Sequence, residues 1–390
     1  MKRSTDRILT TTVGSLVRPP EVLEAMRRKV DGQPFDPSDL AVVKEKSAEA
    51  VKKQREVGVD IPSDGEFSKS SFAGYVTDRL TGWEFTTKYP MRGGGTARSR
   101  DRRMFPDFYD AERSSNVAPA NQTTGWPVCT GPITYRGEEA TKVDLENFKS
   151  ALAGQDFEEA FVPACGPATI ELQRANVYYK TEEEYLFAIA EAMKTEYKMI
   201  VDAGFILQID DPRIVTEWDS FDPEPTPEEY RKFAEVRIEA LNMALKGLPE
   251  DRVRYHLCWG SWPGPHVTDA PLGEIAEVIL KVNAGAFSIE GANTMHEHEY
   301  HTWERIKFPE GKVLIPGVVA HSTSHVEHPE LVKERIMRYA NLVGRENVIA
   351  TTDCGFAQGA GTARVPTSIM WEKLRRLSQG AELASKALWG

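Results

Sequence analysis

The chain has few cysteines, no long apolar run and no excess of basic residues. Its four cysteines in 390 residues are too few for a disulfide framework and fit the reduced thiols of the cytoplasm. No stretch approaches the roughly 18 apolar residues of a membrane-spanning helix, and no apolar signal block follows the first residues. We therefore expect a cytoplasmic protein that has no membrane partner.

The net charge of −11 argues against nucleic acid as a partner, because nucleic acids and anionic membranes select basic surfaces. A hydrophobic content of 41% over this length is enough to bury one large core or two modest ones. The composition thus indicates a globular protein that acts on small molecules, and it leaves a homo-oligomer open.

A glycine-rich phosphate loop is also missing. Residues 8–13 predict a first strand, but the sequence after it is Gly14-Ser15-Leu16, where an open dinucleotide-binding sheet would normally carry its phosphate-binding glycines. Further apolar runs alternate with amphipathic segments, at residues 59–62, 160–165, 205–209, 253–258, 286–290, 313–319 and 348–354. Eight strand–helix units of this kind predict an α/β fold, a (β/α)8 TIM barrel.

Helix start signals support the alternation. Asp36 followed by Pro37 predicts the N-terminus of a helix that runs to Gly58. Capping boxes at Thr181 and Thr226, each with a glutamate three residues later, predict two more helices between apolar runs.

The alternation fails between residues 67 and 159. We expect one barrel domain over residues 1–390 with 67–159 as an inserted subdomain or lid, because structureless loops of that length are uncommon in compact domains. Within it, residues 83–87 and 128–135 have the composition of strands that pair. The basic run at 98–103 has three interpretations: a solvated face, a grip on an anionic substrate, or a contact with a neighbouring subunit.

His256 and Cys258 stand two residues apart at the end of an apolar run. Their side chains would project from one face of a strand, since strand side chains repeat with period two. Tetrahedral zinc takes about four N, S or O ligands, and Glu290 and Cys354 end two later runs. The pattern predicts a zinc site, although a buried histidine beside a core cysteine is the alternative for the pair taken alone.

Polar residues follow nearly every predicted strand. In a (β/α)8 barrel the carboxyl ends of all strands open on one mouth, where active sites lie. We therefore expect one mouth to gather residues that are far apart in sequence, namely Ser15, Glu66, Asp210, His256, Cys258, Glu290, His321 and Cys354.

Several segments, taken in order, resemble the catalytic domain of cobalamin-independent methionine synthase: Thr12-Val13-Gly14-Ser15, Asp64-Gly65-Glu66, Gln208 to Pro212, His256-Leu257-Cys258, Ile289-Glu290 and Asp353-Cys354-Gly355. The resemblance implies zinc held by His256, Cys258, Glu290 and Cys354. It also implies that Ser15, Glu66 and Asp210 bind the amino-acid end of a thiol such as homocysteine, and that His321 donates a proton. Leu172-Gln173 stand where the family has a pterin-stacking tryptophan, so the methyl donor stays unassigned.

The ligand types indicate the chemistry. Two thiolates and one carboxylate around Zn²⁺ give a formal charge of −1, which suits an electron-rich bound sulfur better than a hydroxide. A zinc-bound acceptor thiol would ionise below its ordinary pKa of about 8.5 and attack an alkyl carbon. The leaving atom needs a proton, for which histidine is suited; His321 is the candidate, with His325 and His328 as rivals.

Other interpretations stay open. Short single-barrel relatives include epoxyalkane:coenzyme M transferase, in which a similar site activates a thiol to open an epoxide. A third reading is a zinc- or thiol-binding barrel without turnover. The charges of Glu66 and Asp210 favour an acceptor with an ammonium group over the sulfonate of coenzyme M, unless an arginine such as Arg18 intervenes.

Two further groups have a structural and a functional reading. Asp211, beside Asp210, either joins the site or caps the loop before Pro212. The close spacing of His296, His298 and His301 is typical of a second metal cluster or of an exposed helix start beside the mouth.

Overall fold

The computed structural model describes residues 1–30, 36–92, 99–115 and 125–390. Its larger sheet is parallel and has the strand order β1-β10-β9-β8-β7-β6-β4. The strands are β1 (Leu9–Thr10), β4 (Phe161–Cys165), β6 (Ile206–Asp210), β7 (Val253–Leu257), β8 (Ala286–Ile289), β9 (Val313–Val319) and β10 (Ile349–Thr352).

Residues 59–62 close this sheet into a barrel. Asp60 N and Ile61 N both donate to Thr10 O, at 3.1 and 3.0 Å, and Thr11 forms a parallel bridge with Ile61. On the other side, Phe161 N donates to Pro62 O at 3.1 Å. The short segment therefore occupies the second strand position between β1 and β4, and the predicted (β/α)8 barrel is confirmed.

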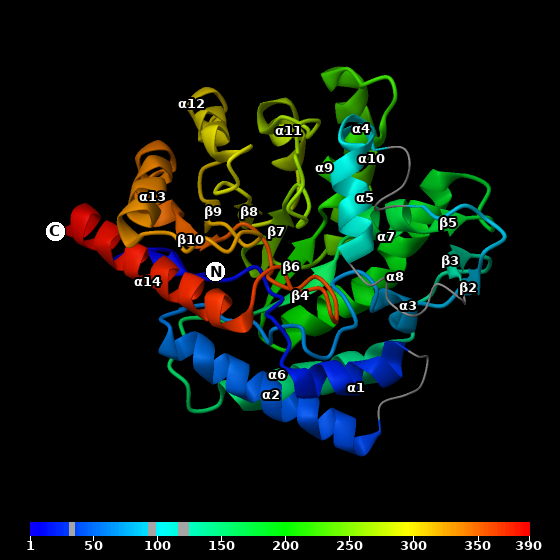
Figure 1. The fold of residues 1–390 in the computed structure, drawn as a ribbon, viewed down its shortest axis with the longest axis horizontal. Helices are drawn as coiled ribbons and strands as arrows, with labels where there is room; N and C mark the ends of the chain where they lie inside the picture. Colours follow the sequence, from blue (N-terminus) through cyan, green and yellow to red (C-terminus); the bar gives the residue numbers. More distant parts are fainter. Residues whose placement is uncertain (31–35, 93–98, 116–124) are drawn as a thin grey trace.

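Helices surround the strands, as Figure 1 shows. Their bounds are α1 (Pro20–Val30), α2 (Pro37–Glu56), α6 (Glu138–Leu152), α7 (Pro167–Gln173), α8 (Glu182–Asp202), α9 (Arg213–Thr216), α10 (Pro227–Leu245), α11 (Leu272–Ile279), α12 (Thr302–Arg305), α13 (Pro329–Val343) and α14 (Thr367–Trp389), with short 3-10 turns at η2 (Glu217–Ser220), η3 (Glu250–Arg252), η4 (Glu297–His301) and η5 (Arg345–Asn347). The predicted caps are present: Asp36 and Thr226 form capping boxes, and Thr181 accepts from Glu184 N.

The lower interior of the barrel is filled by apolar side chains that come from most of the strands. This cluster consists of Leu9, Ile61, Phe161, Ile206, Ala286, Val313, Ile315 and Ile349. Arg254 of β7 lies above it, with its guanidinium 3.3 Å from the centre of the Phe161 ring and bonded to Gln208 Oε1 at 2.7 Å. Because the bottom is packed, any ligand space has to lie at the upper end, beyond the strand carboxyl termini.

Two strands of the inserted segment join one later strand in a second, smaller sheet. Here β2 (Trp83–Thr86) pairs antiparallel with β3 (Trp126–Cys129), and β3 pairs parallel with β5 (Ala175–Asn176). The predicted pairing is thus present, but the second strand lies at 126–129 and not at 128–135. Pro132 cannot donate to a ladder, and Tyr135 instead bridges antiparallel to Leu80.

The remaining helices of the inserted segment are α3 (Val76–Arg79), α4 (Arg100–Met104) and α5 (Pro106–Ser115). Helix α4 contacts α5 and the η2 turn, and Figure 1 shows α4 in the upper part of the molecule. The arginines of this segment form ion pairs: Arg100 with Glu224 at 2.9 Å and Arg103 with Asp222 at 3.1 Å. Arg98, which began the predicted basic run, lies outside the described residues.

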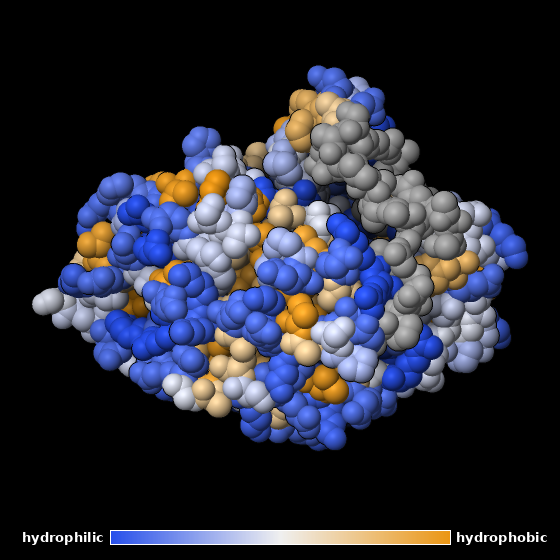
Figure 2. All heavy atoms as spheres, turned by 60° about the horizontal axis from the view of Figure 1, so that its bottom comes forward, coloured by the Kyte–Doolittle hydropathy of each residue, from blue (hydrophilic) through white to orange (hydrophobic). Residues whose placement is uncertain are grey.

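Helix α6 packs against α2 and α8, which is the place of a barrel helix between the second and third strand positions. We therefore propose that the insertion ends before Glu138, inside the expected 67–159 range. Among the described residues, no helix combines the length and apolar composition that a membrane span requires. On the face drawn in Figure 2, apolar residues are scattered among hydrophilic ones.

Candidate active site and metal centre

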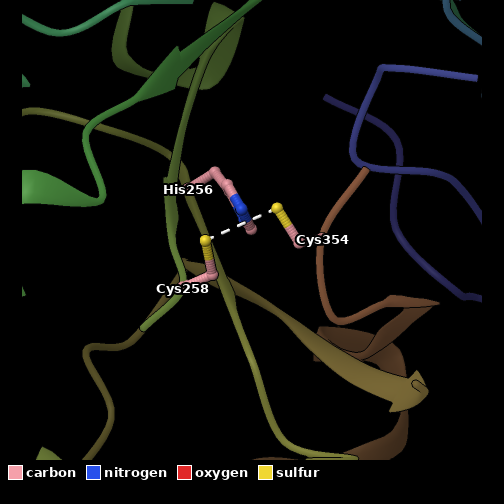
Figure 3. A group of neighbouring side chains, drawn as sticks. All are labelled: His256, Cys258 and Cys354. Carbon is pink, nitrogen blue, oxygen red and sulfur yellow. Dashed lines mark hydrogen bonds between the residues drawn. The ribbon is translucent and has the colours of Figure 1, made fainter. Parts of the chain in front are cut away.

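His256, Cys258 and Cys354 meet at the upper end of the barrel. Their ligand atoms all lie within 4.8 Å of one another, and Cys258 Sγ is 3.4 Å from Cys354 Sγ. Figure 3 shows the three side chains pointing toward a common space. His256 belongs to β7 and Cys258 follows it, while Cys354 follows β10. Period-two spacing brings the first two together, and Cys354 joins them because the carboxyl ends of the strands, β8 and β9 lying between these two, all open on one mouth.

The imidazole of His256 has one satisfied and one unsatisfied nitrogen. Nδ1 lies 3.1 Å from Ser288 Oγ, whereas Nε2 is buried without a hydrogen-bond partner among the described residues. Burial and the nearby Arg254 guanidinium lower its pKa to about 3, so the ring is neutral and Nε2 offers a lone pair. This is the form in which histidine binds metals, with the other nitrogen held by a neighbouring polar group.

The two cysteines are free thiols and are buried. The contact with Cys354, followed by burial, raises the pKa of Cys258 well above its ordinary value, because two adjacent thiolates repel each other without a cation. A bound metal cation would remove this cost, and sulfur with imidazole suits zinc. The residues present therefore fit a zinc ion.

Glu290 does not join these three residues. Its Oε2 accepts from Trp259 N at 2.8 Å and its Oε1 accepts from Asn293 Nδ2 at 3.0 Å. Both carboxylate oxygens thus bind the protein, so the role of Glu290 as a fourth ligand stays a prediction.

Asp353 is a residue whose role the sequence did not reveal. Its Oδ1 accepts from Gly291 N at 2.9 Å and from Ala292 N at 2.7 Å, so it ties the loop after Glu290 to the residue preceding Cys354. Burial and the nearby Glu290 charge raise its pKa to about 8. An acidic residue at a strand end, directly before a ligand cysteine, was the available signal.

A pocket of about 230 Å³ opens above the cysteines. Its wall includes the three metal-site residues and two of the predicted substrate residues. The complete wall consists of Val13, Ser15, Phe72, Gln173, Asp210, Pro212, Arg213, Thr216, His256, Cys258, Gly260, Ser261, Trp262, Cys354, Gly355, Gln358 and Arg364. Ser15 and Asp210 are therefore in the pocket wall together with the candidate metal centre.

Glu66 and Asp210 are buried carboxyl groups. Burial is the main cause that raises the pKa of each, and the Glu66 charge raises that of Asp210 further, while the Lys69 ammonium opposes both shifts. Glu66 Oε2 has no hydrogen-bond partner among the described residues, and the residue has a left-handed φ of 60°. Buried carboxylate oxygens that lack a hydrogen-bond donor favour a cationic partner, which supplies donors and positive charge.

Arg18, the arginine nearest to this site in sequence, is already engaged. Its guanidinium donates to three backbone carbonyls: Glu66 O at 2.8 Å, Lys69 O at 2.9 Å and Ala357 O at 3.1 Å. Arg18 thus joins the loops after the first and second strand positions to the loop after β10. These contacts make it a structural residue, and it does not appear in the pocket wall.

His321 lies behind the pocket wall. It follows β9, is 1% exposed, and neither ring nitrogen has a hydrogen-bond partner among the residues that the structure describes. Burial, followed by the charges of Arg364 and His256, lowers its pKa to about 3. The rivals His325 and His328 are exposed, and His328 Nδ1 caps α13 by accepting from Glu330 N at 3.2 Å. Of the three histidines, only His321 is buried near the candidate metal centre.

Asp211 points away from this chemistry. Its Oδ1 accepts from Thr169 N and Thr169 Oγ1, both at 2.7 Å, at the start of α7. The side chain therefore caps the first turn of α7, whereas the expected cap was on the loop before Pro212.

His296 does not lie on an exposed helix start, which corrects that reading for this residue. It is 3% exposed, its Nδ1 lies 2.8 Å from Glu299 Oε2, and its Nε2 lies 3.0 Å from Asp269 Oδ2. The same Asp269 oxygen lies 2.7 Å from His266 Nδ1. His298 and His301 are exposed as expected. The buried charges form an internal network, and the sequence spacing alone could not distinguish His296 from its neighbours.

Fold and site together define a (β/α)8 barrel with a candidate zinc–thiolate centre at the carboxyl end of its strands. Residues 8–136 and 127–370 match the family model of the cobalamin-independent synthase, catalytic domain. The chain belongs to this family.

Relatives and structures of nearly the same length are similar to the chain. A methionine synthase of Thermococcus kodakarensis is 24% identical over 97% of this chain and 94% of the relative. The uncharacterized protein YxjH of Bacillus subtilis is 24% identical over 94% and 91%, respectively. A B12-independent methionine synthase of Shewanella sp. W3-18-1, solved in complex with selenomethionine, has a TM-score of 0.70 at 20% identity, with 98% and 99% of the two chains covered. This last similarity supports the fold.

Proposed function

We propose that the protein is a zinc-dependent transferase that moves a methyl or other alkyl group to the sulfur of a homocysteine-type thiol. The observation that carries the proposal is the unpartnered, buried Nε2 of His256, which faces two free thiols beside a pocket. The relatives named methionine synthase support the same reaction class.

The proposed metal ligands are His256, Cys258 and Cys354, with Glu290 as the predicted fourth and weaker ligand, which an incoming thiol would displace. The first three leave one position of a tetrahedral zinc ion open toward the pocket, whereas a purely structural zinc is saturated by four protein ligands. Bound there, zinc would lower the pKa of an incoming thiol and keep its sulfur nucleophilic. An open position is the feature that favours catalysis over a barrel that only stores or senses metal.

The proposed acceptor-binding residues are Ser15, Glu66 and Asp210. Glu66 has a buried oxygen without a partner, and Asp210 lies in the pocket wall. An ammonium group on the acceptor would supply the missing hydrogen-bond donors and offset two buried negative charges. Because Arg18 is bonded to backbone carbonyls, it would not serve the sulfonate of coenzyme M. The buried acceptors thus favour homocysteine, and the epoxide-opening alternative would need a pocket arginine, Arg213 or Arg364, to bind the sulfonate.

His321 remains our proposed proton donor. With a pKa of about 3, its ring is neutral at pH 7, so it would first take up a proton from solvent, once an anionic ligand has raised that pKa, and then donate this proton to the leaving atom. Its burial near His256 keeps it close to the reacting sulfur and away from bulk water.

The test is X-ray absorption at the zinc edge with homocysteine, coenzyme M or 3-mercaptopropionate, together with binding titrations of each thiol. We expect homocysteine to add one sulfur to the zinc and to bind tightest. Glu66→Gln should weaken homocysteine and leave 3-mercaptopropionate, which has no ammonium, nearly unchanged. No added sulfur with any thiol would overturn the proposed function, and tighter binding of coenzyme M in the unmodified protein would promote the epoxide-opening reaction.

A further inference from the structure

We propose that Trp262 limits the size of the alkyl group that the pocket accepts, and that Tyr109 and Asp101 of the inserted segment hold Trp262 in place. Trp262 is then a specificity-determining residue, and the other two are positioning residues. The inference rests on the proposed function, because it assumes that an alkyl group joins a sulfur in this pocket.

The indole of Trp262 is fixed by its own loop. It stacks on the His266 ring, with centroids 4.6 Å apart and an interplanar angle of 25°. Gly260, at φ +96°, and Gly264 both face the indole so closely that a Cβ on either would overlap it. Only glycine at these two positions lets the ring lie against the backbone. The ring is therefore held on several sides before the inserted segment is considered.

The inserted segment adds a hydrogen-bond chain to the indole. Trp262 Nε1 donates to Tyr109 Oη at 3.1 Å, and Tyr109 Oη donates to Asp101 Oδ2 at 2.6 Å. Asp101 Oδ1 accepts from Val267 N at 3.0 Å, and Asp101 N donates to Asp219 Oδ1 at 3.0 Å. Asp101 is 2% exposed. Helices α4 and α5 are thus bonded both to the loop after β7 and to the η2 turn.

Trp262 lies at a position in the pocket wall where it would restrict the size of the alkyl group. It lines the same pocket as Cys258, four residues earlier in the loop, while Ser15 and Asp210 are assigned to the acceptor's polar end. The alkyl group would contact lining residues that are not assigned to the acceptor's polar end, and Trp262 and Phe72 are the aromatic side chains among them. A total of about 230 Å³ is below the roughly 300–1,000 Å³ of pockets that hold drug-sized ligands. A rigid indole in this wall restricts the S-alkyl group to a small one such as methyl.

The test compares two thioethers that resemble reaction products, methionine and S-benzylhomocysteine, by calorimetric titration of the zinc-loaded protein. The unmodified protein should bind methionine and exclude the benzyl compound. Trp262→Ala should improve binding of S-benzylhomocysteine by about tenfold, because removal of the indole relieves an overpacked fit. The dissociation constant of methionine should change by less than about twofold. Tyr109→Phe should change the ratio of the two dissociation constants, S-benzylhomocysteine to methionine, by about threefold in the same direction. The ring stays, but its hydrogen bond to the indole is lost.

Tyr178→Phe is the matched control, because Tyr178 is an exposed tyrosine that follows β5 of the small sheet, and loss of its hydroxyl should not change the relative binding of the two thioethers. Hydrogen exchange supplies a readout independent of ligand: Asp101→Asn and Tyr109→Phe should speed exchange of the amides around Val267. Equal changes for both thioethers in Trp262→Ala, or equal binding of both in the unmodified protein, would refute the size limit. If the unmodified protein binds neither thioether nor homocysteine, the proposed function itself fails, and the inference fails with it.

Discussion

Two buried histidine clusters lie near Glu290 and differ in how their ring nitrogens are satisfied. In the cluster of His266, His296 and Asp269, every ring nitrogen has a partner: His266 Nε2 lies 3.0 Å from Trp262 O, and the other nitrogens lie within 3.0 Å of carboxylate oxygens. In the cluster of His256 with Cys258, Nε2 has none among the described residues.

The difference indicates which cluster is the better candidate for a ligand. A buried polar atom without a partner costs free energy, so native proteins rarely leave one unless a metal, water or substrate completes it. In the satisfied cluster the bonds hold the loops: His296 stacks on Trp259 at 3.9 Å and His266 stacks on Trp262. We therefore expect metal dependence from the cluster of His256 with Cys258, and stability effects from the cluster of His266, His296 and Asp269.

The largest expected effect is loss of metal. The isolated protein should contain one zinc per chain, and Cys354→Ser or His256→Ala should remove it, because two protein ligands rarely retain zinc. Circular dichroism should show an intact fold, since the site lies at the barrel rim and the core is separate. Cys129→Ser, in the small sheet, is the matched control. Retention of a full zinc equivalent by the ligand variants would show that the assignment is wrong.

The next effect belongs to the satisfied cluster. His296→Gln should keep zinc but lower the free energy of unfolding by about 3 kcal/mol, because it leaves buried carboxylates without their cation. Burial would lower the pKa of His296, but its bonds to Asp269 and Glu299 raise it from 6.5 to about 10.

The raised pKa of His296 fixes the sign of the pH dependence. The stabilisation is fully present below pH 6.5 and is lost as the pH rises toward 10. Denaturation of the unmodified protein and of His296→Gln should therefore differ most at mildly acidic pH and converge near pH 10. His301→Gln, an exposed histidine paired with Glu304, serves as control. A difference that grows with pH would contradict the ionised network.

A smaller effect should follow from the residue behind the metal ligand. Ser288→Ala removes the partner of His256 Nδ1 and should weaken zinc binding by roughly tenfold to a hundredfold, the range typical of such supporting groups. Competition with a chromophoric chelator measures the affinity. Unchanged affinity would mean that the serine does not orient the ring.

The smallest effect on metal binding should come from Glu290. Because the oxygens of Glu290 are hydrogen-bonded to Trp259 and Asn293, Glu290→Gln should lower the affinity for zinc by less than about tenfold. Cys354→Ser, in contrast, should remove the metal. A complete loss of zinc would establish Glu290 as a true ligand of the loaded protein and would bring the two clusters into one site.

The local features were determined by the sequence itself. Period-two spacing placed His256 and Cys258 on one face of β7, and the capping residues Asp36 and Thr226 set helix starts at the predicted positions. Alternating apolar runs and amphipathic segments sufficed for the barrel. These features depend on residues that are near one another in the chain, so their geometry follows from backbone periodicity.

Only the tertiary structure decided the rest, because it depends on contacts between distant segments. Cys354 approaches Cys258 across 96 residues, whereas Glu290 is drawn to Trp259 and Asn293. Arg18 was a candidate anion binder until three backbone carbonyls were found to occupy it. Residue type states which bonds a side chain is able to form, but the distances set by folding select which of those bonds it makes.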